Sequence, residues 1–264
     1  MGAPQGVDTT KPSPARVYDY VLGGTDNFEV DRAVADPILA HAPELRDLAA
    51  DNRRFLERVV RHVVGDHGVT QILDIGSGLP TANNVHQVAQ AIDQRTRVVY
   101  VDNDPTVHVQ AQALIVGDEN TRYVNGDVRT PERILNAPAT QELIDFGRPV
   151  AVLFVSILQF VHDSDDPYGV VQHILSEVPS GSYVAIAHVT DHEIDPVVHA
   201  KIEEMYANVP SRFYFRDRDA FSRFFSGWDV LPPGITTVGD WTVDGAPPGE
   251  RRPMNAWCGL ARKP

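Results

Sequence analysis

Short apolar segments alternate with helical segments along the middle of this chain, and no other feature of the sequence constrains the fold as strongly. The apolar segments are seven to eleven residues long, and the segments between them show the periodicity of amphipathic helices. The predicted strands cover residues 70–76, 96–104, 121–127, 148–158 and 181–190. Strands and helices that alternate in this way form βαβ units with parallel strands. The pattern therefore predicts an α/β fold with a doubly wound, mostly parallel sheet.

Two segments near the C-terminus predict strands that leave the parallel pattern. Residues 228–238 and 254–263 are joined by a polar loop, which is typical of an antiparallel pair at the edge of a sheet. Together with the five strands above, they predict a seven-stranded sheet with an antiparallel C-terminal edge. Helices are expected before this pair, over residues 195–208 and 217–225.

The N-terminal part of the chain has a different character. Residues 1–13 are rich in Pro, Gly and Thr, and we expect them to form a flexible tail. Residues 14–65 consist of helical pieces separated by glycine and proline, and we expect them to form a cap on an α/β core of residues 66–264. A chain of 264 residues lies within the range of one α/β domain with additions, so residues 14–264 are expected to fold as a single domain.

Charge and cysteine content exclude several classes of function. Lys and Arg number 23 against 36 Asp and Glu, which gives a formal net charge of −13. This field repels a polyanion, and no dense run of basic residues offsets it, so we expect no nucleic-acid partner. Cys258 is the only cysteine, which excludes thiol-rich metal sites and favours the reducing cytoplasm. No long apolar run or secretory leader is present, so no membrane span is expected.

Acidic residues stand at the ends of three consecutive predicted strands. Asp74 precedes the glycine turn formed by Gly76 and Gly78, Asp102 ends the second strand, and Asp127 ends the third. Ligands of doubly wound sheets bind at the carboxyl ends of the strands, where the strand order reverses. Asp102 is placed to accept hydrogen bonds from two ribose hydroxyls, and Asp127 to accept one from an adenine amino group. The three acids therefore predict a nucleoside site, although each alone is also explained as a turn former or helix cap.

Asp74 distinguishes between the nucleosides that such a glycine turn binds. A dinucleotide places its pyrophosphate over the turn, and two like charges ~4 Å apart repel by about 4 kcal/mol at an effective dielectric constant of about 20. Thr81 also stands where the dinucleotide pattern has its third glycine. S-adenosylmethionine carries an ammonium and a sulfonium and no phosphate, so a carboxylate beside the turn attracts it. We therefore expect a cationic nucleoside, with an NAD-type dehydrogenase on a related fold as the alternative.

These residues resemble the first motif of class I S-adenosylmethionine-dependent methyltransferases, which is an acid followed by Gly-x-Gly-x-Gly. Pro80 takes the place of the third glycine here. More narrowly, the chain resembles a bacterial methyltransferase family long catalogued as a domain of unknown function. The matching segments are spread over residues 13–264, and the most specific of them is PARVYDYVLGGTDNFEVDR at residues 14–32. The resemblance implies a Rossmann-like class I fold, S-adenosyl-L-methionine as the cofactor and a helical cap over its site.

The resemblance also implies which residues bind the methyl donor. In the α/β core they are Asp74, Gly76, Ser77, Gly78, Asp102, Asn103, Asp127, Val128 and Ser156. In the cap they are Arg16, Tyr18, Tyr20, Gly23, Gly24 and Asn27. Arg16 is suited to pair with the carboxylate of the donor. The competing interpretation is that the charged residues of the cap lie on its surface and that its tyrosines only anchor it.

No catalytic base is assigned from the sequence. His162 follows the fourth predicted strand and is the one candidate, but a loop histidine that caps the next helix is the competing interpretation. His188 and His192 lie near Asp191 and Glu193, yet this loose spacing runs off a strand end, so no metal site is expected. We expect an S-adenosylmethionine-dependent methyltransferase that acts on an unidentified small molecule. The alternatives are the dehydrogenase and a non-catalytic S-adenosylmethionine-binding protein.

Overall fold

The computed structural model describes residues 7–80, 83–192, 194–206, 213–243 and 255–264, and the structural statements below concern this part of the chain. The first six residues of the predicted tail lie outside it. Thr81 and Glu193, which entered the sequence-based interpretation, also lie outside the described residues.

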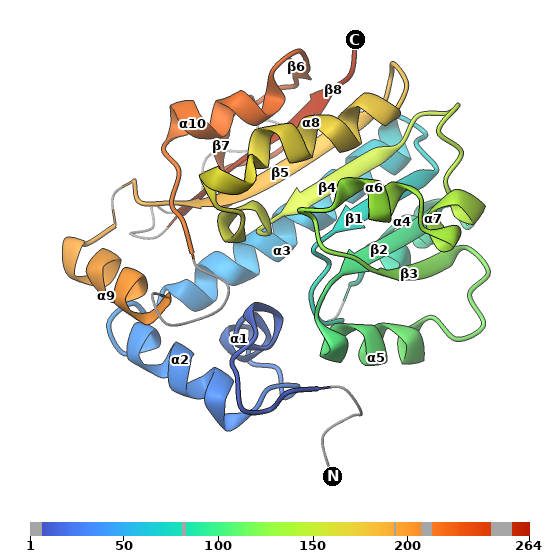
Figure 1. The fold of residues 1–264 in the computed structure, drawn as a ribbon. Helices are drawn as coiled ribbons and strands as arrows, with labels where there is room; N and C mark the ends of the chain where they lie inside the picture. The colour runs from blue at the N-terminus through green and yellow to red at the C-terminus, as the bar shows by residue number, and fades with distance from the viewer. Residues whose placement is uncertain (1–6, 81–82, 193, 207–212, 244–254) are drawn as a thin grey trace.

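A mixed sheet, with eight strands among the described residues, forms the centre of the molecule (Figure 1). The strands follow the order β3-β2-β1-β4-β5-β8-β6, and β7 also pairs with β8. The five parallel strands are β1 (Gln71–Ile75), β2 (Arg97–Asp102), β3 (Thr121–Asn125), β4 (Ala151–Val155) and β5 (Tyr183–Thr190). All five lie within the predicted strand segments. The order reverses between β1 and β4, so the doubly wound parallel sheet is confirmed.

The C-terminal strands form the predicted antiparallel edge. Strand β8 (Asn255–Arg262) runs antiparallel to β5, and its other edge pairs with β6 (Asp229–Val230) and β7 (Thr236–Thr237). The sheet is therefore seven strands wide, because β6 and β7 share one position beside β8. The segment between them contains Pro232 and Pro233, which have no N–H to donate to a sheet, so the first predicted edge strand is divided into two short pieces.

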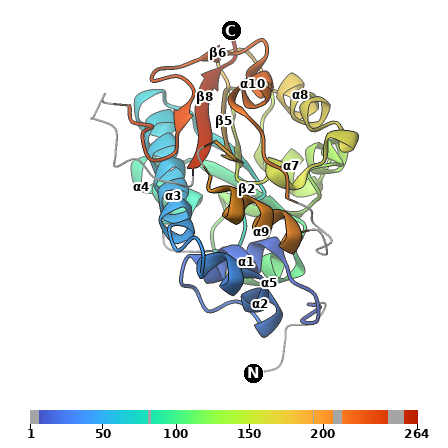
Figure 2. The same cartoon turned by 90° about the vertical axis from the view of Figure 1, so that its left-hand side faces the viewer.

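Helices cover both faces of the sheet (Figure 2). Successive strand residues point to opposite faces, so Ile72 packs in one hydrophobic core and Leu73 in the other. The first core lies under α3 (Leu45–Arg61) and α4 (Val85–Ile92); the second lies under α6 (Pro131–Leu135), α7 (Pro138–Leu143), α8 (Pro167–Glu177) and α10 (Arg218–Ser222). Helix α5 (Pro105–Leu114) packs beside β3. None of the described helices is both long and apolar enough to cross a membrane.

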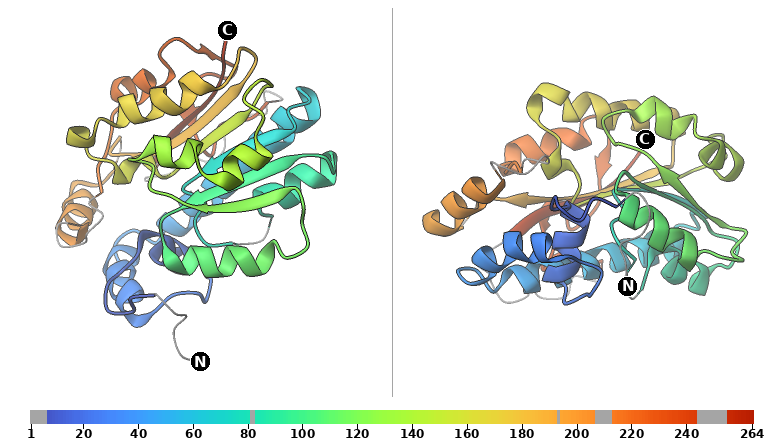
Figure 3. Two further views of the ribbon diagram at one scale, coloured as in Figure 1. Left: turned by 45° about the vertical axis from the view of Figure 1, so that its right-hand side comes forward. Right: turned by 60° about the horizontal axis from the view of Figure 1, so that its bottom comes forward.

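Three helices lie beyond the carboxyl ends of the parallel strands (Figures 1 and 3). They are α1 (Pro14–Val21), α2 (Glu29–Leu39) and α9 (Pro196–Tyr206). Helices α2 and α9 pack side by side although they are far apart in the sequence. Helix α3 connects this layer to the sheet, because Ala49 in its first half packs with α1 and Phe55 in its second half packs in the sheet core. The space between these helices and the strand ends holds the candidate site.

The central strand β4 provides a test of the packing. Phe154 is 0% exposed in the core beneath α8, whereas Val116 is 82% exposed. We expect Phe154→Ala to lower the free energy of unfolding by about 3–5 kcal/mol, because it removes a large buried side chain and leaves a cavity. The control Val116→Ala should change it by less than about 0.5 kcal/mol. Urea unfolding measures both, and equal effects would contradict this placement of the core.

Candidate functional site

The glycine turn after β1 is fastened to the end of β2. The backbone N–H groups of Gly76 and Ser77 both donate to the carbonyl oxygen of Val101, at 2.8 and 3.1 Å. The N–H of Gly78 donates to Oδ2 of Asp102 at 2.8 Å. Gly76 has a φ of +75°, and a Cβ at this position would lie 2.5 Å from the side chain of Ile157. The turn therefore needs glycine at residue 76 for both its conformation and its packing.

Two of the three strand-end acids have raised pKa values, so they stay protonated to a higher pH than an ordinary aspartic acid does. Burial raises the pKa of Asp74 to about 7, an effect that the positive charge of Arg53 opposes. Burial also raises the pKa of Asp102 to about 6, although its carboxylate accepts hydrogen bonds from the N–H groups of Gly78 and Asp104. A cation placed beside either carboxyl group would stabilise its ionised form and lower its pKa.

Asp127 differs from these two acids. Its carboxylate is bound by Arg129, with Nε donating to Oδ1 at 2.9 Å and Nη2 to Oδ2 at 2.5 Å. These hydrogen bonds lower the pKa of Asp127. Asn103 also donates to it, at 3.3 Å. The backbone N–H of Arg129 donates to Oδ1 as well, so Asp127 is a fixed anion at the edge of the site, and its longest hydrogen bond, from Asn103, is the one that a ligand donor would replace.

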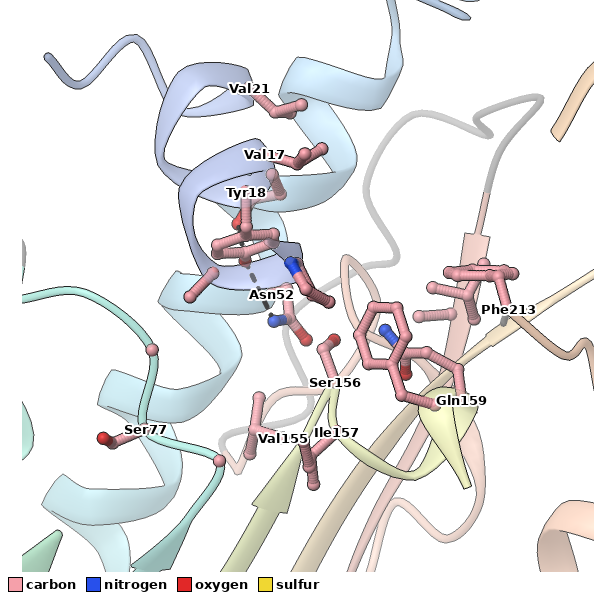
Figure 4. A pocket seen from close by; sticks show the side chains of 18 of the residues that line it. Val17, Tyr18, Val21, Asn52, Ser77, Val155, Ser156, Ile157, Gln159 and Phe213 are labelled. Atoms are coloured by element: carbon pink, nitrogen blue, oxygen red, sulfur yellow. Dashed lines mark hydrogen bonds between the residues drawn. The ribbon is translucent and has the colours of Figure 1, made fainter. Parts of the chain in front are cut away.

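One cavity connects the three strand ends. Asp74, Asp102 and Asp127 all line it, so the predicted common cleft is present. Seven further residues predicted to bind the donor also line this cavity: Gly76, Ser77, Gly78, Asn103, Val128, Ser156 and Tyr18. Figure 4 shows Ser77 on one side of the hollow and Ser156 near its centre. The core part of the predicted site is thus assembled at one place.

Most of the predicted cap residues are placed elsewhere. Arg16 is buried, and its Nε donates to Asp31 at 2.8 Å, so the guanidinium that was expected to face the donor carboxylate is paired within the N-terminal helices and does not line the cavity. Tyr20 donates its hydroxyl proton to Asp36 at an exposed position. Asn27 donates to Asp19 and so holds the connection between α1 and α2. The predicted residues that are absent from the described cavity lining are Arg16, Tyr20, Gly23, Gly24 and Asn27.

Helix α3 contributes two polar lining residues that sequence reasoning missed. Asn52 donates from Nδ2 to the hydroxyl of Tyr18 at 3.1 Å, and that hydroxyl donates to the carbonyl oxygen of Ala49 at 3.1 Å. Arg53 lines the cavity next to Asp74, and within the described part of the chain its guanidinium has no hydrogen-bond or ion-pair partner. The signal for Asn52 was available, because it stands four residues after Leu48 on the apolar face of a predicted helix.

A buried arginine fixes the loop that follows β4. Arg216 donates to the carbonyl oxygens of Leu158 and Val161, both at 2.9 Å, and to Oδ1 of Asp163 at 2.7 Å. It also donates to Nε2 of His188 at 2.7 Å. Burial and the charge of Arg216 lower the pKa of His188 to about 3, so this histidine stays neutral. The clamp positions the loop residues that line the cavity, which include Gln159.

The other histidines noted in the sequence take structural positions. Nδ1 of His162 accepts the backbone N–H of Ser164, and its side chain does not line the cavity, which agrees with the helix-cap interpretation. His192 stacks on Trp257, while His188 belongs to the arginine clamp. The described residues contain no cluster of three or more acidic, His or Cys side chains able to hold a metal ion.

Comparison with known proteins decides the family. A model of the S-adenosyl methyltransferase family matches residues 1–264. The chain belongs to this family. The protein is therefore an S-adenosylmethionine-dependent methyltransferase. Neither the dehydrogenase nor the non-catalytic alternative receives support from the comparisons. Among curated protein sequences, no relative of this methyltransferase was found.

Solved structures agree with this assignment. A DUF574 family protein from Streptomyces avermitilis is 35% identical and superposes with a TM-score of 0.90. The match covers 97% of this chain and 99% of the Streptomyces chain. A putative methyltransferase from Thermobifida fusca is 36% identical, with coverage of 100% and 99% and a TM-score of 0.90. N-methyltransferase NodS from Bradyrhizobium japonicum, in complex with S-adenosyl-L-homocysteine, is 10% identical, with coverage of 94% and 99% and a TM-score of 0.50. This last similarity shows the fold alone.

The two turn glycines form a matched pair for mutation. Both have positive φ, but a Cβ on Gly76 meets Ile157, whereas a Cβ on Gly78 meets nothing within 4 Å. We expect Gly78→Ala to cost about 1 kcal/mol of unfolding free energy through backbone strain alone. Gly76→Ala should cost at least about 2 kcal/mol more, because Ile157 or the turn must move. Denaturant unfolding compares them, and the reverse order would contradict the turn geometry.

Proposed function

We propose that this methyltransferase binds S-adenosyl-L-methionine along the three strand ends and transfers its methyl group to a small molecule. The observation that carries the proposal is that Asp74, Asp102 and Asp127, from adjacent strands, line one cavity. Asp74 faces the cationic methionine end, Asp102 accepts from the ribose hydroxyls, and Asp127 accepts from the adenine amino group. Two raised pKa values support this arrangement, since a bound cation favours the ionised carboxylates.

The orientation of Asp102 is set before any ligand binds. Its two carboxylate oxygens accept the N–H groups of Gly78 and Asp104, at 2.8 and 3.0 Å, and each oxygen keeps a lone pair for a ribose hydroxyl. Val128 is buried, lines the same cavity as Asn103 and supplies an apolar surface for the adenine. This preorganisation lowers the cost of ordering the site around the donor.

Arg53 takes the role that the sequence assigned to Arg16. The methionine end of the donor carries both an ammonium and a carboxylate. Asp74 and Arg53 present the two complementary charges in the same part of the cavity. Because the guanidinium of Arg53 has no partner among the described residues, a carboxylate there gains a charge-assisted hydrogen bond without breaking another.

Methyl transfer to a bound acceptor depends mainly on position. The donor supplies an electrophilic methyl group, and the chain holds the acceptor in line with it and excludes water. The helices α1 and α2 of the proposed cap, residues 14–65, close the cavity through Val17 and Ala35. We place the reaction in the cytoplasm, because the lone Cys258 is a buried free thiol. The net charge of −13 favours a small-molecule acceptor over a nucleic acid.

Donor binding should depend on pH. Asp74 and Asp102 have pKa values of about 7 and about 6 without ligand, so both are largely protonated at pH 5 and ionised at pH 8. The cationic donor requires the ionised forms, so its binding releases protons. For each linked proton, the Kd of the donor should rise by up to about tenfold for every pH unit below 7. Calorimetric titration with S-adenosylmethionine from pH 5 to 8 measures this dependence.

The control for this titration is Asp74→Asn, which removes one titrating group. This variant should bind more weakly at pH 8 and show a shallower dependence between pH 6 and 8. A wild-type Kd that does not change with pH would contradict the placement of the cation beside Asp74.

The proposed role of Arg53 has a neighbouring control. Arg53→Met should raise the Kd for S-adenosylmethionine by about tenfold or more, through the loss of a charge-assisted hydrogen bond. Arg54→Met changes an arginine whose side chain is 61% exposed and pairs with Asp51, and it should leave the Kd unchanged. Decarboxylated S-adenosylmethionine should bind Arg53→Met and the wild type equally. An Arg53→Met defect that persists with this analogue would contradict the pairing.

A further inference from the structure

The cavity extends beyond the residues assigned to the donor, toward the helices at the strand ends. Apolar side chains from α1, α2, α3, α9 and the segment before α10 line this extension: Val17, Val21, Ile38, Leu48, Ile202 and Phe213. Figure 4 shows the two valines of α1 and Phe213 on different sides of it. An apolar lining of this kind accommodates a compact hydrophobic body such as an aromatic ring.

Two buried oxygen atoms interrupt the apolar lining. Among the described residues, Oδ1 of Asn52 and Oε1 of Gln159 have no hydrogen-bond partner, and both residues are only 4% exposed. Asn52 is held in one orientation, because the single hydroxyl proton of Tyr18 goes to Ala49 and the hydroxyl therefore accepts from Nδ2 of Asn52. Figure 4 shows Asn52 and Gln159 beside the same hollow, with Ser156 between them. Unsatisfied buried oxygens are costly, and a ligand that donates hydrogen bonds would satisfy them.

This end of the cavity offers no general base among the described residues. The acids of the lining belong to the strand ends that hold the donor. Tyr18 gives its proton to Ala49, and burial raises its pKa above the ordinary value, so it does not act as a base. His162 lies outside the lining. The acceptor atom must therefore carry an available lone pair before it enters the site.

We propose that the methyl acceptor is a largely apolar amine whose nitrogen is neutral at pH 7, as in an aromatic amine. The orphan oxygens of Asn52 and Gln159 accept its N–H groups, which turns the nitrogen lone pair toward the donor. This inference rests on the proposed function and names the substrate class of the same site. A phenol fits less well, because its oxygen must lose a proton to a base during attack.

The transfer balances without any other reactant. The nitrogen lone pair forms a bond to the donor's methyl carbon, and the electron pair of the broken carbon–sulfur bond stays on sulfur, which becomes a neutral thioether. The nitrogen gains a positive charge and then releases one N–H proton to water. The amide oxygens of Asn52 and Gln159 bind these N–H groups more strongly as the charge grows, which favours the transition state over the ground state.

The test uses the full chain loaded with S-adenosyl-L-homocysteine and three probes of one shape: naphthylamine, naphthol and naphthalene. Naphthylamine should bind the wild type on the order of tenfold more tightly than naphthalene. Gln159→Met and Asn52→Leu should each reduce this preference to about twofold or less, because each removes an acceptor while keeping the volume. The control Gln94→Met changes an exposed glutamine and should keep the full preference.

Activity with the methyl donor completes the test. Labelled methyl groups should accumulate on the nitrogen of naphthylamine and not on the oxygen of naphthol. Equal binding of the three probes, binding of none of them, or faster methylation of naphthol would overturn the inference while leaving the donor site intact. If the wild type fails to bind S-adenosyl-L-homocysteine, the proposed donor site itself fails, so the two failures are distinguishable.

Discussion

The attachment of the glycine turn to the end of β2 is the interaction on which the site depends. Three N–H groups of the turn donate to acceptors at that end, two to the carbonyl of Val101 and one to Asp102. These bonds fix the turn backbone and the carboxylate of Asp102 in one unit. They also keep Gly76 close to Ile157, and so connect the turn to the loop after β4. The turn after β1 and the loop after β4 therefore form one continuous part of the cavity lining.

The site also contains several buried polar groups whose burial is energetically unfavourable without a ligand. Asp74 and Asp102 are buried acids with raised pKa values, and within the described part of the chain the side-chain oxygens of Asn52 and Gln159 are buried without hydrogen-bond partners. A raised pKa means that these acids stabilise the fold at low pH and lose that contribution as pH rises from about 4 toward 7. Such groups lower stability, and they are found where a ligand of complementary charge or hydrogen bonding completes the structure.

Long-range contacts hold the loop after β4, which lies next to the glycine turn. Arg216 clamps the loop after β4 through two carbonyl oxygens and Asp163, and neutral His188 supports its guanidinium from β5. Helix α3 brings Asn52 to the same hollow from a segment more than a hundred residues earlier. This part of the cavity is therefore made by tertiary packing of segments that are far apart in the sequence.

By itself, the sequence determined the parallel sheet and the acids at its edge. Buried strands are read from local apolar runs, and parallel pairing brings their carboxyl ends together, so Asp74, Asp102 and Asp127 had to converge. Only the tertiary structure decided which cap residues face the cavity. Arg16 turns to Asp31, while Arg53 turns to the site. The direction of a helical side chain depends on how the helix docks, and docking is set by distant residues that no local pattern reveals.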